Sequence, residues 1–277
     1  MRTRMAYLRL TRPFMSVIAG LTAALGCFFG EPTTMAVVTY VGSAIVLLTA
    51  AGFVMNDVLE VDKDRANPRK PLATGEADIR YAAVLLSFLV AIAAVLLTKV
   101  NILATVIGAT QFLVLVVYST IKAKNAIVAN AVTGLLCASC FLYGAMVANA
   151  PWVNWFVPAI TALLVTTARE LAKDMLDVDA DRVAGIRTAP IRWGVRTTSW
   201  VLLTICVAAT VVIAGYVVVR GTSILPLFVL LCALIVVAPI AMVCRTEYHR
   251  RILPFVLVTN ALALPTGLLA FLLVAIH

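Results

Sequence analysis

Long apolar stretches, separated by short polar connections, dominate the pattern along this chain. A helix needs about 20 apolar residues to cross the hydrocarbon core of a bilayer. Nine stretches approach or reach that length, and they predict nine transmembrane helices near residues 14–30, 35–54, 81–97, 102–118, 126–147, 155–168, 200–219, 224–243 and 252–276. The stretch 155–168 is short for a span, so we expect its helix to continue through Arg169 into the polar segment that follows. The pattern therefore predicts an all-α integral membrane protein.

The composition supports this fold class and excludes an ordinary soluble domain. Of the 277 residues, 63% are hydrophobic and only 13% charged, and the mean hydropathy is +1.05, whereas soluble domains average about 25% charged residues. If nine helices alternate in direction, 20 of the 22 Lys and Arg residues fall on one face of the membrane, and only Lys99 and Arg220 fall on the other. The positive-inside rule then places the N-terminus in the cytoplasm and the C-terminus outside. This bias also accounts for the net charge of +9, so no nucleic-acid partner is expected.

Acidic residues, by contrast, are concentrated in two short segments. Eleven of the 13 acidic residues lie within positions 57–78 or 170–181. Two sets of four share the same offsets, each directly after a predicted helix on the cytoplasmic side: Asp57, Glu60, Asp62 and Asp64, and Asp174, Asp177, Asp179 and Asp181. A solvated acidic loop explains one such set, but identical spacing at the ends of two spans indicates a functional site.

The chemistry of these residues favours a metal site. On a continuous helix, the first, second and fourth acid of each set share one face. Carboxylates this close repel one another, and a hard divalent cation such as Mg²⁺ or Mn²⁺ removes the conflict. Lys and Arg residues interleaved with the acids suit a bound polyanion, because they neutralise the charge that the metals leave. Two facing clusters would hold two metal ions around a polyphosphate.

With these motifs the chain resembles the UbiA superfamily of intramembrane prenyltransferases, which has nine transmembrane helices around a central cavity. The family's NDxxDxxxD, DxxDxxxD and YxxxK motifs match Asn56 to Asp64, with Glu60 for the usual Asp, Asp174 to Asp181, and Tyr118 with Lys122. The resemblance implies a single domain, an isoprenoid diphosphate donor, a lipophilic acceptor and an allylic carbocation formed among apolar helices within the membrane lipids. The implied metal ligands are Asn56, Asp57, Glu60, Asp64, Asp174, Asp177 and Asp181, with Asp57, Asp64, Asp174, Asp181 and Lys122 catalytic. The implied diphosphate contacts are Arg12, Arg69, Tyr118, Lys122 and Lys173.

Several alternatives stay open at this point. Arg12 is a diphosphate contact or only an orientation signal, and Asn130 is a substrate contact or a packing amide between helices. The sequence around the motifs is most similar to the branch that makes digeranylgeranylglyceryl phosphate. An aromatic acceptor, a terpene cyclase and, in a different class, a cation-coupled transporter are the other interpretations. The paired motifs also suggest two related halves, about 1–122 and 126–243, followed by a ninth helix. The sequence does not indicate an oligomeric state.

Overall fold

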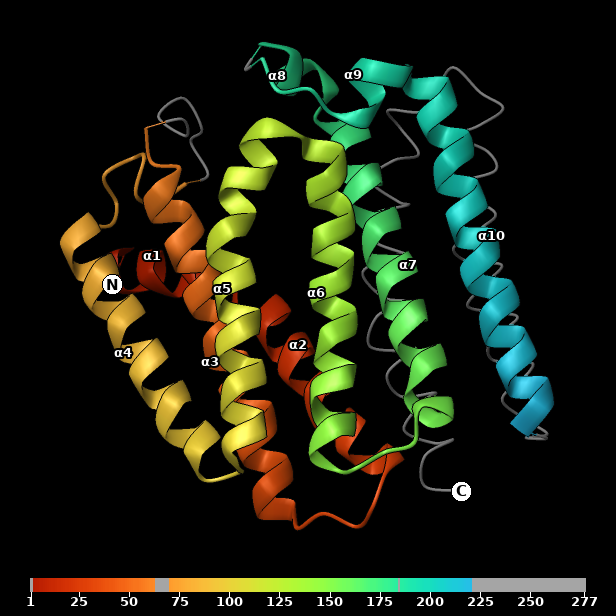
Figure 1. Ribbon diagram of the computed structural model, residues 1–277. Helices are drawn as coiled ribbons and strands as arrows, with labels where there is room; N and C mark the ends of the chain where they lie inside the picture. The colour runs from red at the N-terminus through yellow and green to blue at the C-terminus, as the bar shows by residue number, and fades with distance from the viewer. Residues whose placement is uncertain (1, 63–69, 184, 221–277) are drawn as a thin grey trace. The chain divides into compact units, whose positions relative to one another are not determined.

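The computed structural model describes residues 2–62, 70–183 and 185–220, and these residues form helices and turns without a strand. In chain order the helices are α1 (Arg2–Leu10), α2 (Pro13–Gly26), η1 (Cys27–Phe29), α3 (Met35–Leu59), α4 (Ile79–Thr98), α5 (Ile102–Lys124), α6 (Ala126–Val147), α7 (Trp152–Leu176), α8 (Val178–Val183), α9 (Ala189–Trp193) and α10 (Val195–Arg220) (Figure 1). Seven predicted spans correspond to α2, α3, α4, α5, α6, α7 and α10. The predicted spans 224–243 and 252–276 lie outside the described residues.

The lengths and composition of the helices agree with a membrane protein. Within the described residues, five helices are long and apolar enough to cross a bilayer, namely α3, α4, α6, α7 and the 195–216 part of α10. Two shorter apolar helices cover 13–29 and 102–118. The prediction that the sixth span continues past Arg169 is confirmed, because α7 ends at Leu176. The count of nine helices stays a prediction.

Polar side chains fix where several helices begin. Thr34 accepts a hydrogen bond from the backbone N–H of Val37 at the start of α3, and Asp78 accepts one from Arg80 at the start of α4. Asn101 and Asn125 act in the same way before α5 and α6. These are the residue types that favour helix N-caps, because their side-chain oxygens satisfy N–H groups that have no partner within the helix.

The chain divides into two compact units. The first comprises Met1–Thr120 with Cys140–Pro151, and the second comprises Ile121–Ser139 with Trp152–His277. In the first unit α3 packs against both α2 and α4, and α1 lies against α3. In the second, α7 and α10 run side by side and α9 contacts both (Figure 1). The prediction of two related halves with boundaries at 122 and 126 stays a prediction.

Small residues allow the helices of each unit to approach closely. In the first unit, a methyl group at Gly144 of α6 would overlap the carbonyl oxygen of Ala23 in α2, and one at Gly26 would overlap that of Phe141. In the second unit, Gly134 of α6 lies against Leu163 and Thr167 of α7. Membrane helices associate through such contacts because the lipid chains leave little hydrophobic driving force between helices.

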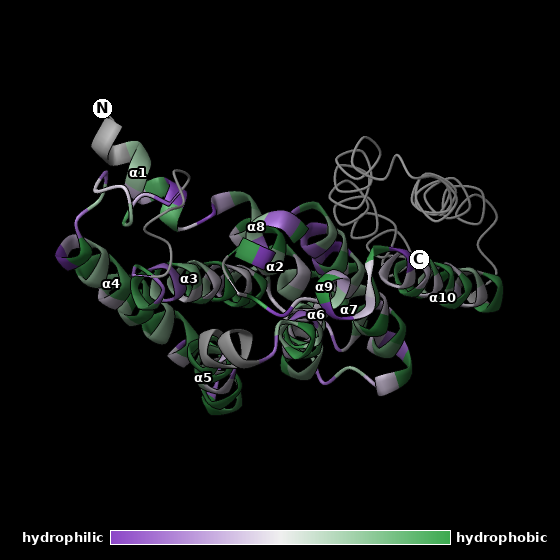
Figure 2. Cartoon of the chain, turned by 90° about the horizontal axis from the view of Figure 1, so that it is seen from above, coloured by the Kyte–Doolittle hydropathy of each residue, from purple (hydrophilic) through white to green (hydrophobic). Residues whose placement is uncertain are grey.

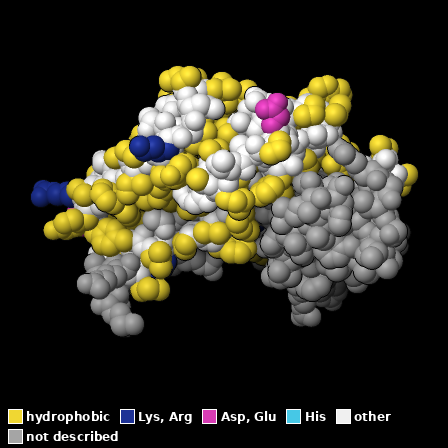
Figure 3. Space-filling view, turned by 90° about the horizontal axis from the view of Figure 1, so that it is seen from below, with side chains coloured by type: hydrophobic (Ala, Val, Ile, Leu, Met, Phe, Trp, Pro, Cys, Tyr) yellow, Lys and Arg dark blue, Asp and Glu magenta, His cyan; other side chains and the backbone are white. Residues whose placement is uncertain are grey.

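The outer surfaces of the helices are apolar. On α4, Val84, Phe88 and Val95 are each 59–66% exposed, and on α10 Val211 is 63% exposed. Hydrophobic residues run along the length of both helices (Figure 2). Seen from below, toward the ends of the helices, the described residues show few charged side chains and many hydrophobic ones (Figure 3). Exposed apolar surface of this extent fits helices that face lipid.

Candidate active site

The first acidic motif lies at the end of α3 in the first unit. Asn56 and Asp57 occupy the last turn and are 8% and 5% exposed. The helix ends at Leu59, and the backbone N–H of Glu60 still donates to the carbonyl oxygen of Asn56 over 3.0 Å. The side chains of the same pair also meet, since Asn56 Nδ2 donates to Glu60 Oε2 over 2.9 Å. The motif therefore begins as a buried, hydrogen-bonded cluster at a helix end.

Two cationic side chains bind one oxygen of Asp57. Lys70 Nζ lies 2.6 Å from Asp57 Oδ1, and a guanidinium nitrogen of Arg12 lies 3.1 Å from the same atom. The guanidinium of Arg12 also stacks 4.6 Å from the ring centroid of Phe53, one helical turn before Asp57. A carboxylate this buried requires charged partners to offset its lost hydration. Arg12 is thus in direct contact with the first motif, and its predicted contact with diphosphate stays a prediction.

The backbone at Arg12 positions this contact. Arg12 has φ 42° and ψ 62°, a left-handed conformation that is uncommon for a residue with a side chain. It precedes Pro13, which starts α2, and its carbonyl oxygen accepts hydrogen bonds from Met15 and Ser16. The helix α1, which precedes Arg12, is bound to the segment before α4 by an ion pair between Arg9 and Glu76 at 3.0 Å. The turn between α1 and α2 thereby directs Arg12 toward α3.

The second acidic motif lies at the end of α7 in the second unit. Asp174 is half-buried, and Asn130 Nδ2 of α6 donates to Asp174 Oδ2 over 2.7 Å. Asn130 is itself 5% exposed. Asp177 is exposed between α7 and α8, and Asp181 is half-buried within α8. Asn130 therefore connects α6 to a motif carboxylate at the end of α7, and its predicted contact with substrate stays a prediction.

The prediction that the first, second and fourth acids of each set share one face applied to a continuous helix, and neither motif is a continuous helix within the described residues. In the first motif α3 ends before Glu60, and in the second the chain breaks between α7 and α8 at Asp177. Backbone hydrogen bonds from Asp177 to Lys173 and from Asp181 to Asp177 nevertheless keep a helix-like spacing across the second break. Both motifs thus lie at helix ends, where the backbone can turn.

A third group of charges precedes Asp174 on α7. Glu170, 8% exposed, accepts hydrogen bonds from Arg169 at 3.1 Å and from Lys173 at 2.7 Å. The predicted diphosphate contact Lys173 is therefore held by Glu170 one turn earlier. Because Lys173 remains half-exposed, its ammonium group is oriented yet accessible.

The other predicted site residues are described only in part. Asp64 and Arg69 lie outside the described residues, and for Lys122 the structure describes the α5 backbone alone. Tyr118 is half-buried on α5. The two motifs belong to different units, so their facing each other stays a prediction. Among the described residues no group of three or more His, Cys, Asp or Glu side chains is close enough to hold a metal ion.

The donor groups that are described nonetheless suit a hard divalent cation. They are carboxylate and amide oxygens, the ligands that Mg²⁺ prefers. Asn56 Oδ1 is buried beside Asp57 and Glu60 without a hydrogen-bond partner in the described part of the chain. A buried amide oxygen without a partner is costly, and a cation or water at that point would satisfy it.

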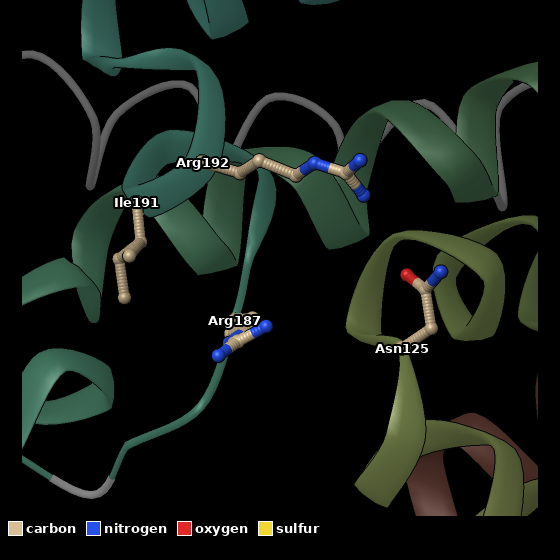
Figure 4. Close-up of a pocket in the computed structure, with 4 residues that line it drawn as sticks. All are labelled: Asn125, Arg187, Ile191 and Arg192. Carbon is tan, nitrogen blue, oxygen red and sulfur yellow. The ribbon is translucent and has the colours of Figure 1, made fainter.

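Sequence reasoning missed several residues that the structure brings to these sites. Lys70 was passed over in favour of its neighbour Arg69, and Phe53 and Arg169 received no role. A pocket of about 460 Å³ in the second unit was also missed; it is lined by Asn125, Arg187, Ile191 and Arg192 (Figure 4). The signal for Lys70 was present in the sequence, because it is one of two adjacent cations that follow the first motif.

Comparison with known proteins decides the family. The UbiA prenyltransferase family matches residues 14–258, which include both acidic motifs. The chain belongs to this family. It is 36% identical over 200 residues to digeranylgeranylglyceryl phosphate synthase of Methanoculleus marisnigri, covering 70% of each chain. It is 35% identical over 197 residues to the synthase of the same name from Natronomonas pharaonis, covering 69% of this chain and 70% of that one.

Solved structures of UbiA proteins share the fold. A structure of digeranylgeranylglyceryl phosphate synthase aligns with a TM-score of 0.78 at 22% identity and covers 100% of this chain and 99% of that one. An apo UbiA homologue from Aeropyrum pernix K1 gives a TM-score of 0.77 at 20% identity, with 92% and 97% of the chains covered. A homologue from Archaeoglobus fulgidus, bound to GPP and Mg²⁺, gives 0.66 at 18% identity, with 96% and 99% covered.

Proposed function

We propose that this UbiA prenyltransferase transfers a geranylgeranyl group from its diphosphate to the free hydroxyl of geranylgeranylglyceryl phosphate, a step in ether-lipid synthesis. The observation that carries the proposal is the 36% identity, over 200 residues that cover 70% of the chain, to a synthase of that name. The buried Asp57 with its two cationic partners at the end of a span provides the chemical support, because a diphosphate site needs acids for metal ions and cations for the remaining charge.

The acidic residues are the proposed metal ligands. Mg²⁺ ions, two in our proposal and replaceable by Mn²⁺ of similar ligand preference, would stabilise the negative charge of the departing diphosphate. The proposed ligands are Asn56, Asp57, Glu60 and Asp64 in the first motif and Asp174, Asp177 and Asp181 in the second. Asn56 Oδ1, buried without a partner in the described chain, supports the assignment of the first set.

The basic residues are the proposed diphosphate contacts. Arg12 and Lys70 bring two positive charges to the end of α3, and Lys173 brings one to the end of α7. Arg69, Tyr118 and Lys122 complete the proposed set from the sequence. Preorganised cations stabilise charge that develops on the leaving group and need little rearrangement during the reaction.

The apolar helices serve the other half of the reaction. As the bond between the prenyl C1 and the diphosphate breaks, positive charge develops on the allylic carbon. The acceptor hydroxyl oxygen then forms the new C–O bond and loses its proton. Water would capture the same carbon, so the reaction requires a site from which water is excluded. Long apolar helices within a membrane provide such surroundings for the prenyl chain.

A product assay with purified protein tests the function. We expect Mg²⁺-dependent transfer of labelled geranylgeranyl from its diphosphate to geranylgeranylglyceryl phosphate. Parallel reactions contain an aromatic acid panel or no acceptor. We expect Asp57→Ala and Asp181→Ala to lower turnover by at least about a hundredfold, because each removes a charged group from a site that acts on charge.

Each other outcome contradicts a definite part of the proposal. Transfer to aromatic acids alone would make the acceptor assignment wrong. A product formed without any acceptor would indicate a cyclase. Full activity in both Asp variants would remove the metal-ligand assignment, and cation flux without a prenylated product would favour a transporter.

A further inference from the structure

Among the described residues, a pocket is lined by Asn125, Arg187, Ile191 and Arg192, so its polar side carries two guanidinium groups and one amide. Arg187 comes from the segment that leads into α9, and Arg192 extends from α9 toward Asn125 at the start of α6 (Figure 4). Both arginine side chains are exposed, and neither forms an ion pair with another described residue. Among the described lining residues there is no carboxylate. Such a pocket suits an anion.

The amide of Asn125 adds to this donor set. Its Oδ1 accepts hydrogen bonds from the backbone N–H groups of Ile127 at 3.2 Å and Val128 at 3.3 Å. The oxygen therefore caps α6, and the NH₂ group of the same amide can donate hydrogen bonds to a ligand. Guanidinium groups and an amide NH₂ are donors of the kind that bind phosphate oxygens, to which arginine can donate paired hydrogen bonds.

The volume of the pocket and its apolar residue Ile191 indicate a ligand larger than an inorganic anion. At about 460 Å³ the pocket falls in the size range of small-molecule sites, roughly 300–1,000 Å³. Ile191 is half-buried and gives it an apolar wall. An anion joined to an alkyl or glycerol group would use both kinds of surface.

The pocket lies close to the second acidic motif within the same unit. Asn125 lines the pocket, and Asn130, five residues later, donates to Asp174. At 1.5 Å per residue these two positions are about 7.5 Å apart along the helix. A glycerol lipid that carries a phosphate on one carbon and a free hydroxyl on the adjacent carbon would keep that hydroxyl near a phosphate held in the pocket.

From this geometry we infer that the pocket binds the phosphate monoester of the acceptor lipid and so presents its neighbouring hydroxyl to the prenyl donor. The inference rests on the proposed function and adds the residues that recognise the acceptor. Arg187 and Arg192 bind the phosphate, Asn125 donates a third hydrogen bond, and Ile191 contacts the glycerol. The two arginines are specificity residues, and neither takes part in the bond changes.

Direct binding tests the inference without turnover. Purified protein in maltoside micelles, with EDTA present, is titrated with geranylgeranylglyceryl phosphate and with geranylgeranylglycerol, which lacks the phosphate. We expect the phosphorylated lipid to bind at least about tenfold more tightly. Arg187→Gln combined with Arg192→Gln should lower its affinity about ten- to a hundredfold and leave the alcohol unchanged, as expected for lost charge-assisted hydrogen bonds. Equal affinity in the double variant and the native chain overturns the inference.

Kinetics separate the acceptor from the donor. The double variant should raise the KM for the acceptor about tenfold or more and leave the KM for the donor unchanged. A rise in the donor KM alone would assign the pocket to the diphosphate and overturn the inference. The matched control is Arg196→Gln, which removes an equally exposed arginine of α10 that does not line the pocket. The control should leave both constants unchanged, and partial recovery by Arg187→Lys with Arg192→Lys supports a charge-based contact.

Competition identifies the source of the phosphate. Phosphatidic acid or inorganic phosphate that competes as well as the acceptor lipid would assign the pocket to bulk lipid or free anion and overturn the inference. Failure of the proposed function has a different signature, because the native chain would then form no product from geranylgeranylglyceryl phosphate. Normal product formation by the native chain with unchanged constants in the double variant would contradict the pocket assignment alone.

Discussion

Asp57 shows how much a single carboxylate can depend on residues far away in the sequence. It is 5% exposed, and its partners come from position 12, before the first predicted span, and position 70, after the second. Fixing each cationic side chain against Asp57 costs conformational entropy. For Arg12 the turn before α2 and the contact with the ring of Phe53 restrict the side chain already, which lowers this cost. The site is therefore assembled by tertiary contacts as well as by the motif.

Replacing Lys70 tests this assembly. Lys70→Met removes the partner at 2.6 Å from a buried carboxylate. We expect a loss of about 1–3 kcal/mol in stability, because Arg12 alone then offsets the charge, and a rise of about tenfold in the KM for the donor. Thermal unfolding in detergent and steady-state kinetics measure the two effects. Arg80→Gln, an exposed cation at the start of α4, is the control. A Lys70→Met protein with native stability and donor KM would contradict the role given to Lys70.

At this scale the sequence indicated the acids but not their partners. The spacing of Asp57 and Asp174 follows from the chain itself, so their helix ends could be predicted. Lys70 and Asn130 became part of the site through contacts 13 and 44 residues apart in sequence. Such contacts depend on how helices pack, which no local pattern encodes.

At the scale of the elements, the backbones of α2 and α6 in the first unit lie so close that a methyl group added between them should destabilise the protein. Gly144→Ala would place a methyl group against the carbonyl oxygen of Ala23 and the amide nitrogen of Cys27. We expect it to destabilise the protein by about 1–3 kcal/mol, because the backbone must shift to relieve the overlap. The midpoint of thermal unfolding in detergent measures the effect.

The control for this prediction is another helical glycine. At Gly215 of α10, an added methyl group meets no atom of the described chain within 4 Å. Gly215→Ala should therefore be neutral or stabilise the protein by up to about 1 kcal/mol, since alanine has the higher helix propensity. If Gly144→Ala and Gly215→Ala behaved alike, the close approach of α2 and α6 would be wrong.

The helices were the part of the fold that the sequence predicted best. Uninterrupted apolar stretches of about 20 residues leave few alternatives to a membrane helix. The helix α1 was not predicted, because its basic residues suggested only an orientation signal, although Ala6 and Leu10 are fully buried in the structure. The sequence predicted that both motifs lie at the ends of spans, but not which residue ends α3 or α7, since carboxylates at helix spacing occur equally well just beyond a helix.

For the whole molecule, we propose that the N-terminus and both acidic motifs lie on the cytoplasmic side of the membrane. The two ends of α4 provide a test of this orientation. The helix runs over 20 residues from Ile79 to Thr98, so its two ends should lie on opposite sides of a bilayer. Thr74 precedes it on the proposed cytoplasmic side, and Lys99 follows it on the outer side. Both residues are exposed.

Thiol labelling measures this arrangement in intact cells. In a chain whose six native cysteines are replaced by alanine, we expect Lys99→Cys to react with a membrane-impermeant maleimide. Thr74→Cys should react only after the membrane is permeabilised. The reverse pattern would place the N-terminus and the acidic motifs outside the cell and would contradict the positive-inside interpretation. Equal labelling of both sites would show that α4 does not cross the membrane.

The segment from Gly185 to Gly194 has a consequence for how acceptor preference can change. Both glycines have positive φ, 70° and 83°, and between them Thr188, Ala189 and Pro190 are buried. Ile186, Arg187, Arg192 and Trp193 are exposed on either side of this anchor. The buried anchor and the proposed head-group contacts thus lie within the same ten residues but belong to different side chains. A library that varies only the exposed positions would sample new acceptors while the glycines and the anchor preserve the packing of α7 and α10.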